Sequence, residues 1–319
     1  MDNLKQPDVY AVHHKNQGVR DASRSGGVFT ALSDAVLDKN GVIYGCVLDE
    51  NFNAIHIRAN NAKDRNRMRG SKYIQSNLGD TFQNVKKDLV AGITVLFSGT
   101  SCQVAGLKKY LGKDYDNLIC IDIVCHSVPS TKVWKEYLKW QEKKKKSKVK
   151  KVDFRNKKDY GWREHIETLY FENGKKKDSK VFANLFGQRN IVRPCCYECP
   201  YKSIMHPGDI TIADYWGIEK AAPEFDDNKG VSLVLVNNEF GQKIFDNVKD
   251  MLKYKKTRIE DSMQPALVAP FERPAEREQF WSDFANQDFE FIAKKYGGAS
   301  KVKELKRSLI NIKRKLVKK

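Results

Sequence analysis

Four cysteines are the residues of this 319-residue chain best suited to chemistry. Cys196 and Cys199 form a Cys-x-x-Cys turn, whereas Cys102 and Cys125 each follow a short apolar segment typical of a strand. Two thiolates on one turn bind a single metal centre, and two more complete a four-cysteine set that suits zinc or a [4Fe–4S] cluster. A structural zinc usually has two such turns, so the isolated positions of Cys102 and Cys125 favour a cluster. A redox dithiol at the turn, or chance, is the alternative.

The three other cysteines are expected to have different roles. Cys195 adjoins Cys196 and is the rival for its ligand role, whereas Cys46 and Cys120 lie in apolar segments, where cysteine is usually a small buried residue. The first ten residues, MDNLKQPDVY, lack the apolar core of an export signal. Reduced thiols or metal ligands are therefore favoured over disulfides.

Four short segments carry groups that bind phosphates or planar cofactors. Ser23–Gly27 (SRSGG) precedes a predicted helix, whose N-terminus favours an anion, and Gly99–Ser101 opens another helix. Arg69–Ser76 (RGSKYIQS) combines a glycine turn, hydroxyls, a cation and an aromatic ring. Asp209–Gly217 (DITIADYWG) ends a strand with an acid and two aromatics, which suits a planar ring. The plain alternatives are a capped helix, a solvated loop and a core strand ending in a turn.

Short β-branched runs alternate with amphipathic stretches, which predicts an α/β (mixed α+β) fold with a central mixed sheet flanked by helices. The expected strands are Val42–Asp49, Ile93–Ser98, Leu118–Val124, Asp209–Ala213 and Ser232–Asn237. The expected helices are Gly26–Lys39, with Ser25 as its N-cap, Gln103–Leu111 and Phe240–Leu252. Residues 141–182 are predicted to form a charged antiparallel insertion that turns at Glu172-Asn173-Gly174.

The formal net charge of +18 is concentrated in two places. Lys143–Lys151 holds seven lysines, and Lys301–Lys319 holds nine basic residues and one acid. Because this charge sits in one loop and one tail instead of a recognisable module, we expect no nucleic-acid binding. The apolar runs are much shorter than the roughly 18–20 residues of a membrane span, so we expect a cytoplasmic protein.

The basic tail is expected to be a separate element. A domain over residues 1–290 is followed by a basic amphipathic helix over 291–319, whose apolar seam repeats at spacings of three and four. The seam consists of Val302, Leu305, Leu309, Ile312 and Leu316. Such a helix favours peripheral contact with anionic lipid on the inner face of the membrane, or docking to a partner subunit. Packing of the seam on its own domain is the alternative.

Taken in order, the motifs of this chain resemble those of the coenzyme F-420 hydrogenase/dehydrogenase beta-subunit family. The resemblance covers roughly residues 8–275. It is carried by SRSGGVFTAL (Ser23–Leu32), RGSKYIQS (Arg69–Ser76), VLFSGTSCQVAGL (Val95–Leu107), IDIVCHSVPS (Ile121–Ser130), RPCCYECPYK (Arg193–Lys202), PGDITIADYWGI (Pro207–Ile218) and KGVSLVLVN (Lys229–Asn237).

The resemblance implies an oxidoreductase with FAD and a [4Fe–4S] cluster that passes electrons to an acceptor not yet identified, in a setting such as cell-surface polysaccharide synthesis. It implies that the cluster ligands are Cys102, Cys125, Cys196 and Cys199. It implies that the flavin-site residues are Ser25, Gly26, Gly27, Ser71, Lys72, Tyr73, Gln75, Ser76, Thr100 and Asp214. The catalytic residues are unassigned, with His126 and Asp214 as candidates.

The chain also departs from the family pattern. Ser101 and Ser127 stand where the family often has Pro and Gly. No cysteine precedes Cys46, so we expect a form that lacks the N-terminal ferredoxin domain of many bacterial relatives. Electrons are therefore expected from a ferredoxin-like protein on another chain, or from a nicotinamide or deazaflavin coenzyme that donates hydride. The rival functions are a non-enzymatic four-cysteine zinc scaffold or nucleic-acid-binding protein, and a relative that has lost FAD.

Overall fold

The computed structural model describes residues 6–299, which fall into two compact units. The first unit contains residues 6–128, 155–164 and 193–271, and the second contains residues 129–154, 165–192 and 272–299. The predicted boundary at residue 290 and the predicted helix over 291–319 stay predictions, because residues 300–319, with the apolar seam, lie outside the described part.

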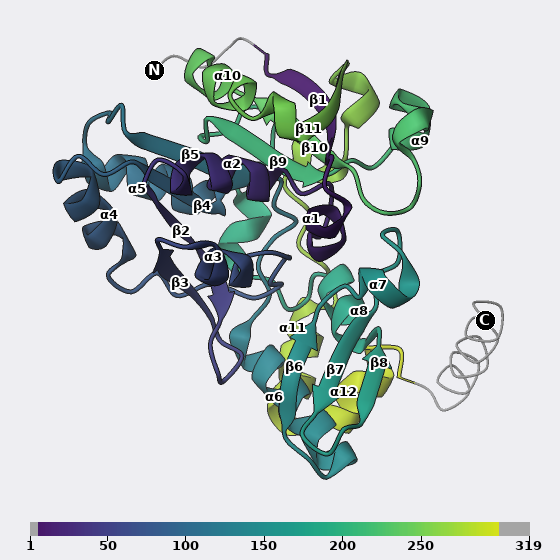
Figure 1. The fold of residues 1–319 in the computed structure, drawn as a ribbon. Helices are drawn as coiled ribbons and strands as arrows, with labels where there is room; N and C mark the ends of the chain where they lie inside the picture. The colour runs from purple at the N-terminus through teal and green to yellow at the C-terminus, as the bar shows by residue number, and fades with distance from the viewer. Residues whose placement is uncertain (1–5, 300–319) are drawn as a thin grey trace. The chain divides into compact units, whose positions relative to one another are not determined.

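An eight-stranded mixed sheet forms the centre of the first unit, which confirms the predicted fold class (Figure 1). The strands β2, β4, β5 and β9 are parallel neighbours, and antiparallel strands flank them on both sides. The spatial order is β11 (Leu252–Thr257), β1 (Asp8–His14), β10 (Ser232–Val236), β9 (Ile210–Asp214), β5 (Leu118–Ile123), β4 (Val95–Thr100), β2 (Val42–Leu48) and β3 (Ala54–Ala59).

Helices cover the two faces of this sheet because alternate residues of each strand point to opposite sides. Ile43, Leu96 and Ile119 belong to a core cluster with α2 (Val28–Leu37) and α10 (Glu239–Asp246). The intervening residues of the same strands, such as Phe97 and Cys120, pack with α4 (Thr81–Val90) and α5 (Ser101–Leu111). The remaining helices of the unit are α1 (Gln17–Ala22), α3 (Ala62–Arg67), α7 (Lys157–Tyr160) and α9 (Ile218–Ala221).

Two predicted helices differ from the structure in detail. Helix α2 begins at Val28, and its N-cap is Gly27 in the left-handed region at φ 94°. Ser25 is therefore not the cap, and its hydroxyl donates to Asp214 instead. The helix predicted over Phe240–Leu252 ends at Asp246, and the chain turns into the edge strand β11 at Leu252, where it pairs with β1.

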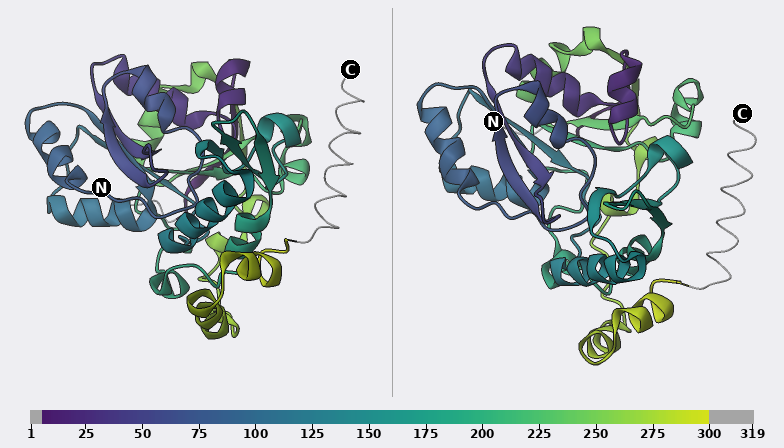
Figure 2. Two further views of the ribbon diagram at one scale, coloured as in Figure 1. Left: turned by 90° about the horizontal axis from the view of Figure 1, so that it is seen from below. Right: turned by 60° about the horizontal axis from the view of Figure 1, so that its bottom comes forward.

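The second unit has an antiparallel sheet of β6 (Val149–Asp153), β7 (Glu167–Phe171) and β8 (Lys176–Ser179), which confirms the predicted antiparallel segment. Gly174 makes the β7–β8 turn at φ 77°. The helices are α6 (Thr131–Lys145), α8 (Val181–Gly187), α11 (Arg277–Asn286) and α12 (Phe289–Lys295) (Figure 2). Trp140 of α6 donates to Glu290 of α12 at 2.8 Å.

The lysine run predicted to lie in a loop is divided between regular elements. Lys143, Lys144 and Lys145 form the last turn of α6, where positive charge is favourable at the carboxyl end of a helix. Lys150 and Lys151 lie in the exposed part of β6. Within residues 6–299, the longest apolar helical stretch falls short of what crossing a bilayer requires.

Candidate functional site

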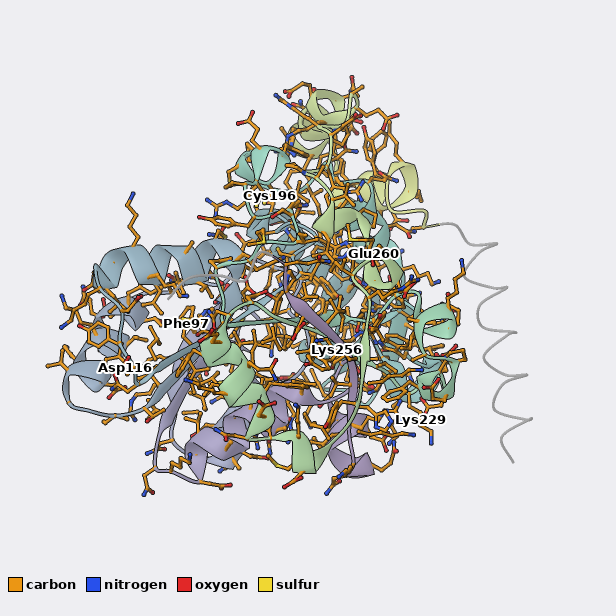
Figure 3. All side chains as sticks on the ribbon, turned by 90° about the horizontal axis from the view of Figure 1, so that it is seen from above. Phe97, Asp116, Cys196, Lys229, Lys256 and Glu260 are labelled. Atoms are coloured by element: carbon orange, nitrogen blue, oxygen red, sulfur yellow. The ribbon has the colours of Figure 1, made fainter. Side chains whose placement is uncertain are left out.

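The four predicted cysteine ligands lie on three separate segments of the first unit. Cys102 is in the first turn of α5, directly after β4, and Cys125 follows β5. Because β4 and β5 are parallel neighbours, their carboxyl ends meet at one edge of the sheet. Cys196 lies in the short 3-10 turn Pro194–Glu198, and Cys199 follows that turn (Figure 3).

The thiols of these cysteines lie within electrostatic reach of one another. Burial raises the pKa of Cys125 to about 12, and the neighbouring thiols of Cys102 and Cys196 raise it further. Burial also raises the pKa of Cys196, and Cys195 and Cys199 contribute in the same direction. The exposed Cys195 therefore stays a rival ligand.

Cys120 is buried, as predicted, whereas Cys46 is only partly buried. Cys120 lies in the core between the sheet and α5, and burial raises its pKa. Burial likewise raises the pKa of Cys46, whose thiol neighbours Lys72 and Ser76.

Two kinds of metal centre take four cysteine ligands, a mononuclear zinc and a [4Fe–4S] cluster. In the described residues, no three His, Cys, Asp or Glu side chains are grouped closely enough to hold a single metal ion. A tetrahedral zinc with Zn–S bonds of about 2.3 Å would draw its four sulfurs to about 3.8 Å from one another. In a [4Fe–4S] cluster each thiolate binds a different iron, so the sulfurs surround a wider space. Four thiol donors suit either centre by their chemistry, and the cluster stays a prediction.

A buried lysine accompanies these thiols. Lys202 is 5% exposed, and its Nζ donates to Ser127 Oγ at 2.9 Å and lies 3.6 Å from the centre of the Phe271 ring. Its positive charge lowers the pKa of both Cys125 and Cys196 against the effect of burial. The sequence offered no signal that Lys202 would be a buried cation beside the cysteines, because lysine is normally exposed.

Ser127 has a backbone conformation that normally requires glycine. Its φ is +100°, and its backbone N–H donates to the Cys125 thiol. This explains in physical terms why a glycine suits the position. A non-glycine residue held in such a region costs of order 1–3 kcal/mol, and it persists where the surroundings fix it.

Thr100 is placed with the cysteines. Its Oγ1 lies 3.2 Å from Cys102 Sγ, and its backbone N–H donates to Gln103 Oε1 at 2.9 Å in a capping box that begins α5.

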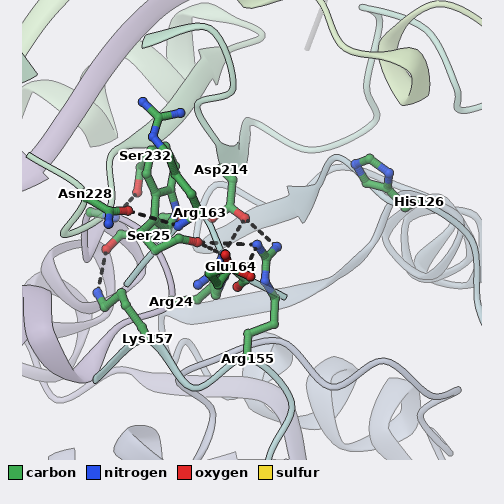
Figure 4. A network of polar contacts seen from close by, with 12 residues as sticks. Arg24, Ser25, His126, Arg155, Lys157, Arg163, Glu164, Asp214, Asn228 and Ser232 are labelled. Carbon is green, nitrogen blue, oxygen red and sulfur yellow. Dashed lines mark hydrogen bonds and ion pairs between the residues drawn. The ribbon is translucent and has the colours of Figure 1, made fainter. Parts of the chain in front are cut away.

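A second polar centre surrounds Asp214, the last residue of β9 (Figure 4). The carboxylate accepts from Trp162 Nε1 at 3.0 Å, Arg155 Nη1 at 3.2 Å, Arg24 Nη2 at 3.4 Å and Ser25 Oγ. A carboxylate offers about four lone-pair positions, and these four donors use them. Asp214 is thus an anchor for two arginines, which the sequence did not identify because both are far from it along the chain.

Gln264 links the Asp214 centre to the cysteine site. Its Nε2 donates to the backbone oxygen of Asp214 at 3.3 Å, and its Oε1 lies 3.3 Å from His126 Nε2. His126 directly follows Cys125 and stacks on Phe271 with a ring separation of 6.1 Å. The two candidate catalytic residues are therefore connected through a side chain that no motif marked.

Other predicted flavin residues have local structural roles. A Cβ on Gly26 would lie 2.1 Å from the carbonyl oxygen of Val12, so close backbone packing requires glycine there. Lys72 Nζ donates to three carbonyls at the end of α3, and burial lowers its pKa to about 8. Ser76 Oγ is 2.7 Å from His56 Nδ1.

The rest of the Arg69–Ser76 loop is divided. Ser71 and Gln75 are exposed. Tyr73 acts electrostatically on Arg24, and so belongs with Ser25 and Asp214. The structure therefore brings together Ser25, Tyr73 and Asp214, and places Lys72 and Ser76 beside Cys46.

Comparisons with known proteins agree with this architecture. Residues 93–262 match the family model for the C-terminal part of the beta subunit of coenzyme F420 hydrogenase/dehydrogenase. A solved structure of the F420-reducing [NiFe] hydrogenase complex from Methanosarcina barkeri, derivatised with xenon, is similar with a TM-score of 0.55. The sequence identity is 19%, over 79% of this chain and 83% of that chain, so this likeness concerns the fold. The chain has no match among curated proteins.

Proposed function

The chain belongs to the coenzyme F420 hydrogenase/dehydrogenase beta-subunit family, a family of oxidoreductase subunits, and from that premise we propose that it is an FAD- and [4Fe–4S]-dependent oxidoreductase. It would pass electrons between a hydride or ferredoxin-type donor and an acceptor. A flavin accepts two electrons as hydride and releases them singly, whereas a cluster carries one electron at a time.

One observation carries the proposal: Cys102, Cys125 and Cys196 come from separate segments, and the thiols of Cys102 and Cys196 both act electrostatically on that of Cys125. Three separate segments of chain would each supply a ligand at one sheet edge. Lys202 would offset part of the negative charge of the thiolates, and the backbone N–H of Ser127 would hold Cys125. Cys199 would complete the set.

The Asp214 centre supports the flavin part of the proposal. Ser25, Tyr73 and Arg24 would face the flavin, and Asp214 would fix the arginines that surround it. Gln264 would keep His126 in a fixed orientation between this centre and Cys125. His126 would hold or move a proton at its Nε2.

The partners follow from the chemistry of the donor. We propose either a ferredoxin-like protein or a nicotinamide or deazaflavin coenzyme, and a role as one subunit of a larger assembly. The same proposal includes a cytoplasmic location and the reduction of an intermediate in cell-surface polysaccharide synthesis. It also includes contact of residues 291–319 with the inner face of the membrane or with a partner subunit.

The experiment is anaerobic purification of the full chain followed by analysis of iron, sulfide, zinc and flavin. We expect about four irons per chain, as a [4Fe–4S] cluster requires, together with FAD. Cys199→Ala should lose the iron, whereas the matched variant Cys195→Ala should keep it if Cys196 is the ligand. Zinc without flavin would favour the colourless scaffold, and full iron in Cys199→Ala would show that the ligand assignment is wrong.

A further inference from the structure

Arg24 is a buried cation whose hydrogen-bonding capacity is only partly used. Its side chain is 10% exposed. Nη2 donates to the carbonyl oxygen of Trp162 at 2.6 Å and to Asp214 Oδ2 at 3.4 Å. Within residues 6–299, Nε and Nη1 are buried without a hydrogen-bond partner. Buried donors left unpaired are costly, so most native structures satisfy them.

The charge around Arg24 is also unbalanced. Asp214 is the carboxylate that acts on it, and Arg155 binds the same carboxylate oxygen at 3.2 Å. Lys157 also lies within electrostatic reach of Arg24 and donates to the carbonyls of Arg20 at 2.7 Å and Lys229 at 2.9 Å. Asp21 also acts on Lys157, and burial together with the charge of Arg24 lowers the pKa of Lys157 to about 8. Positive charge therefore predominates where Arg24 is buried.

Asp214 has no capacity left to correct this imbalance. Its oxygens already accept from Ser25, Trp162 and both arginines, which fills the positions of a carboxylate. The unpaired nitrogens of Arg24 therefore need an acceptor that residues 6–299 do not supply. A guanidinium is the side chain best matched to oxygens of phosphate or carboxylate type.

We infer that Arg24, supported by Arg155, is an oxyanion site that receives a negatively charged oxygen of the redox ligand. The identity of that ligand rests on the proposed function. The oxygen belongs either to a phosphate of the ligand or to the ring carbonyl that carries negative charge in a reduced flavin. Tyr73 acts electrostatically on Arg24, Ser25 donates to Asp214, and Asp214 holds the two guanidinium groups in place.

The test compares Arg24→Gln with Arg163→Gln as the matched control, in the full chain after removal of bound flavin. Arg163 is a nearby arginine whose side chain is 40% exposed and paired with Asp226 at 2.6 Å. Calorimetric titration uses three probes: inorganic pyrophosphate, FAD and riboflavin. Arg24→Gln should weaken FAD binding about tenfold to 100-fold, the effect of a lost hydrogen bond between charged groups, and the control should not.

The probes separate the two sources of the oxygen. Loss of pyrophosphate and FAD binding with unchanged riboflavin binding supports a phosphate, whereas equal weakening of FAD and riboflavin supports the ring oxygen. Unchanged FAD affinity in Arg24→Gln overturns the inference. If the wild type binds no flavin, the proposed function fails, and the pyrophosphate titration alone then tests the oxyanion site. Pyrophosphate binding that is lost in Arg24→Gln supports the site. No pyrophosphate binding by the wild type overturns it.

A stability measurement guards against a trivial loss of fold. Without ligand, Arg24→Gln should unfold at a temperature equal to or above that of the wild type, because it removes a buried cation with unpaired donors. Arg24→Lys is the second variant. It keeps the charge but lacks the planar set of donors, so it should bind the same probes more weakly than the wild type.

Discussion

Glu167 is expected to make the folded chain lose stability as pH rises towards neutrality. This first residue of β7 is 1% exposed, and its Oε1 accepts from the backbone N–H of Phe182 at 3.0 Å and from Tyr137 Oη at 3.2 Å. Burial raises its pKa from 4.5 to about 7, although the hydrogen bond from Phe182 acts in the opposite direction. The carboxyl group is therefore protonated in the folded chain at pH values where it is ionised in the unfolded chain.

The size and sign of the effect follow from this difference in pKa. Between pH 4.5 and about 7 the folded state holds a proton that the unfolded state has lost, so the free energy of unfolding falls as pH rises. The full loss is about 3 kcal/mol, reached above the folded pKa. A glutamine resembles the protonated acid and has no such titration.

The assay is urea unfolding of the wild type and Glu167→Gln at several pH values from 5 to 8. The variant should gain about 3 kcal/mol relative to the wild type between the two ends of this range. Comparing the two proteins cancels other titrations, such as that of His56, whose pKa burial lowers to about 4. Glu136→Gln, on the partly exposed face of α6, is the control and should follow the wild type. Parallel pH profiles for the wild type and Glu167→Gln would refute the reasoning.

Two further predictions concern the cysteine site. In a chain that binds the proposed cluster, Lys202→Met should lower the midpoint potential of that one-electron couple by about 59 mV, because a buried positive charge is lost. The oxidised form would then be favoured about tenfold at a fixed potential. A redox titration followed by electron paramagnetic resonance measures this, with the exposed Lys220→Met as control, and equal midpoints would contradict it. Ser127→Gly should be more stable than Ser127→Ala by about 1–2 kcal/mol in thermal unfolding, because only glycine relieves the positive φ. Equal stabilities would show that this backbone carries no strain.

The sequence predicted the strands that lie in the middle of the sheet and missed those nearer its edges. The segments of β2, β4, β5, β9 and β10 are short and apolar, and burial on both faces imposes such a pattern. By contrast, β11 reads LKYKKT and is exposed over most of its length. Only pairing with β1 makes it a strand, so its local composition carried little information.

The candidate site was predictable where residue type and spacing determine the chemistry. Cysteines near strand ends are uncommon enough to be noticed, and in the structure Cys102 and Cys196 both act electrostatically on Cys125. Their role as ligands stays a prediction. Arg24, Arg155 and Lys202 were missed because a basic residue is solvated by default, and its burial depends on partners far away along the chain. Arg155 and its partner Asp214 are 59 positions apart.

The exposed edge of the large sheet restricts how the chain can assemble with others. Strand β11 carries Lys253, Lys255 and Lys256 along this edge. Two of them reach back to acids of their own unit, since Lys255 pairs with Glu224 at 2.7 Å and Lys256 pairs with Asp8 at 2.8 Å. Long charged side chains along an edge hinder the addition of a foreign strand. Growth of the sheet from molecule to molecule is therefore disfavoured at this edge.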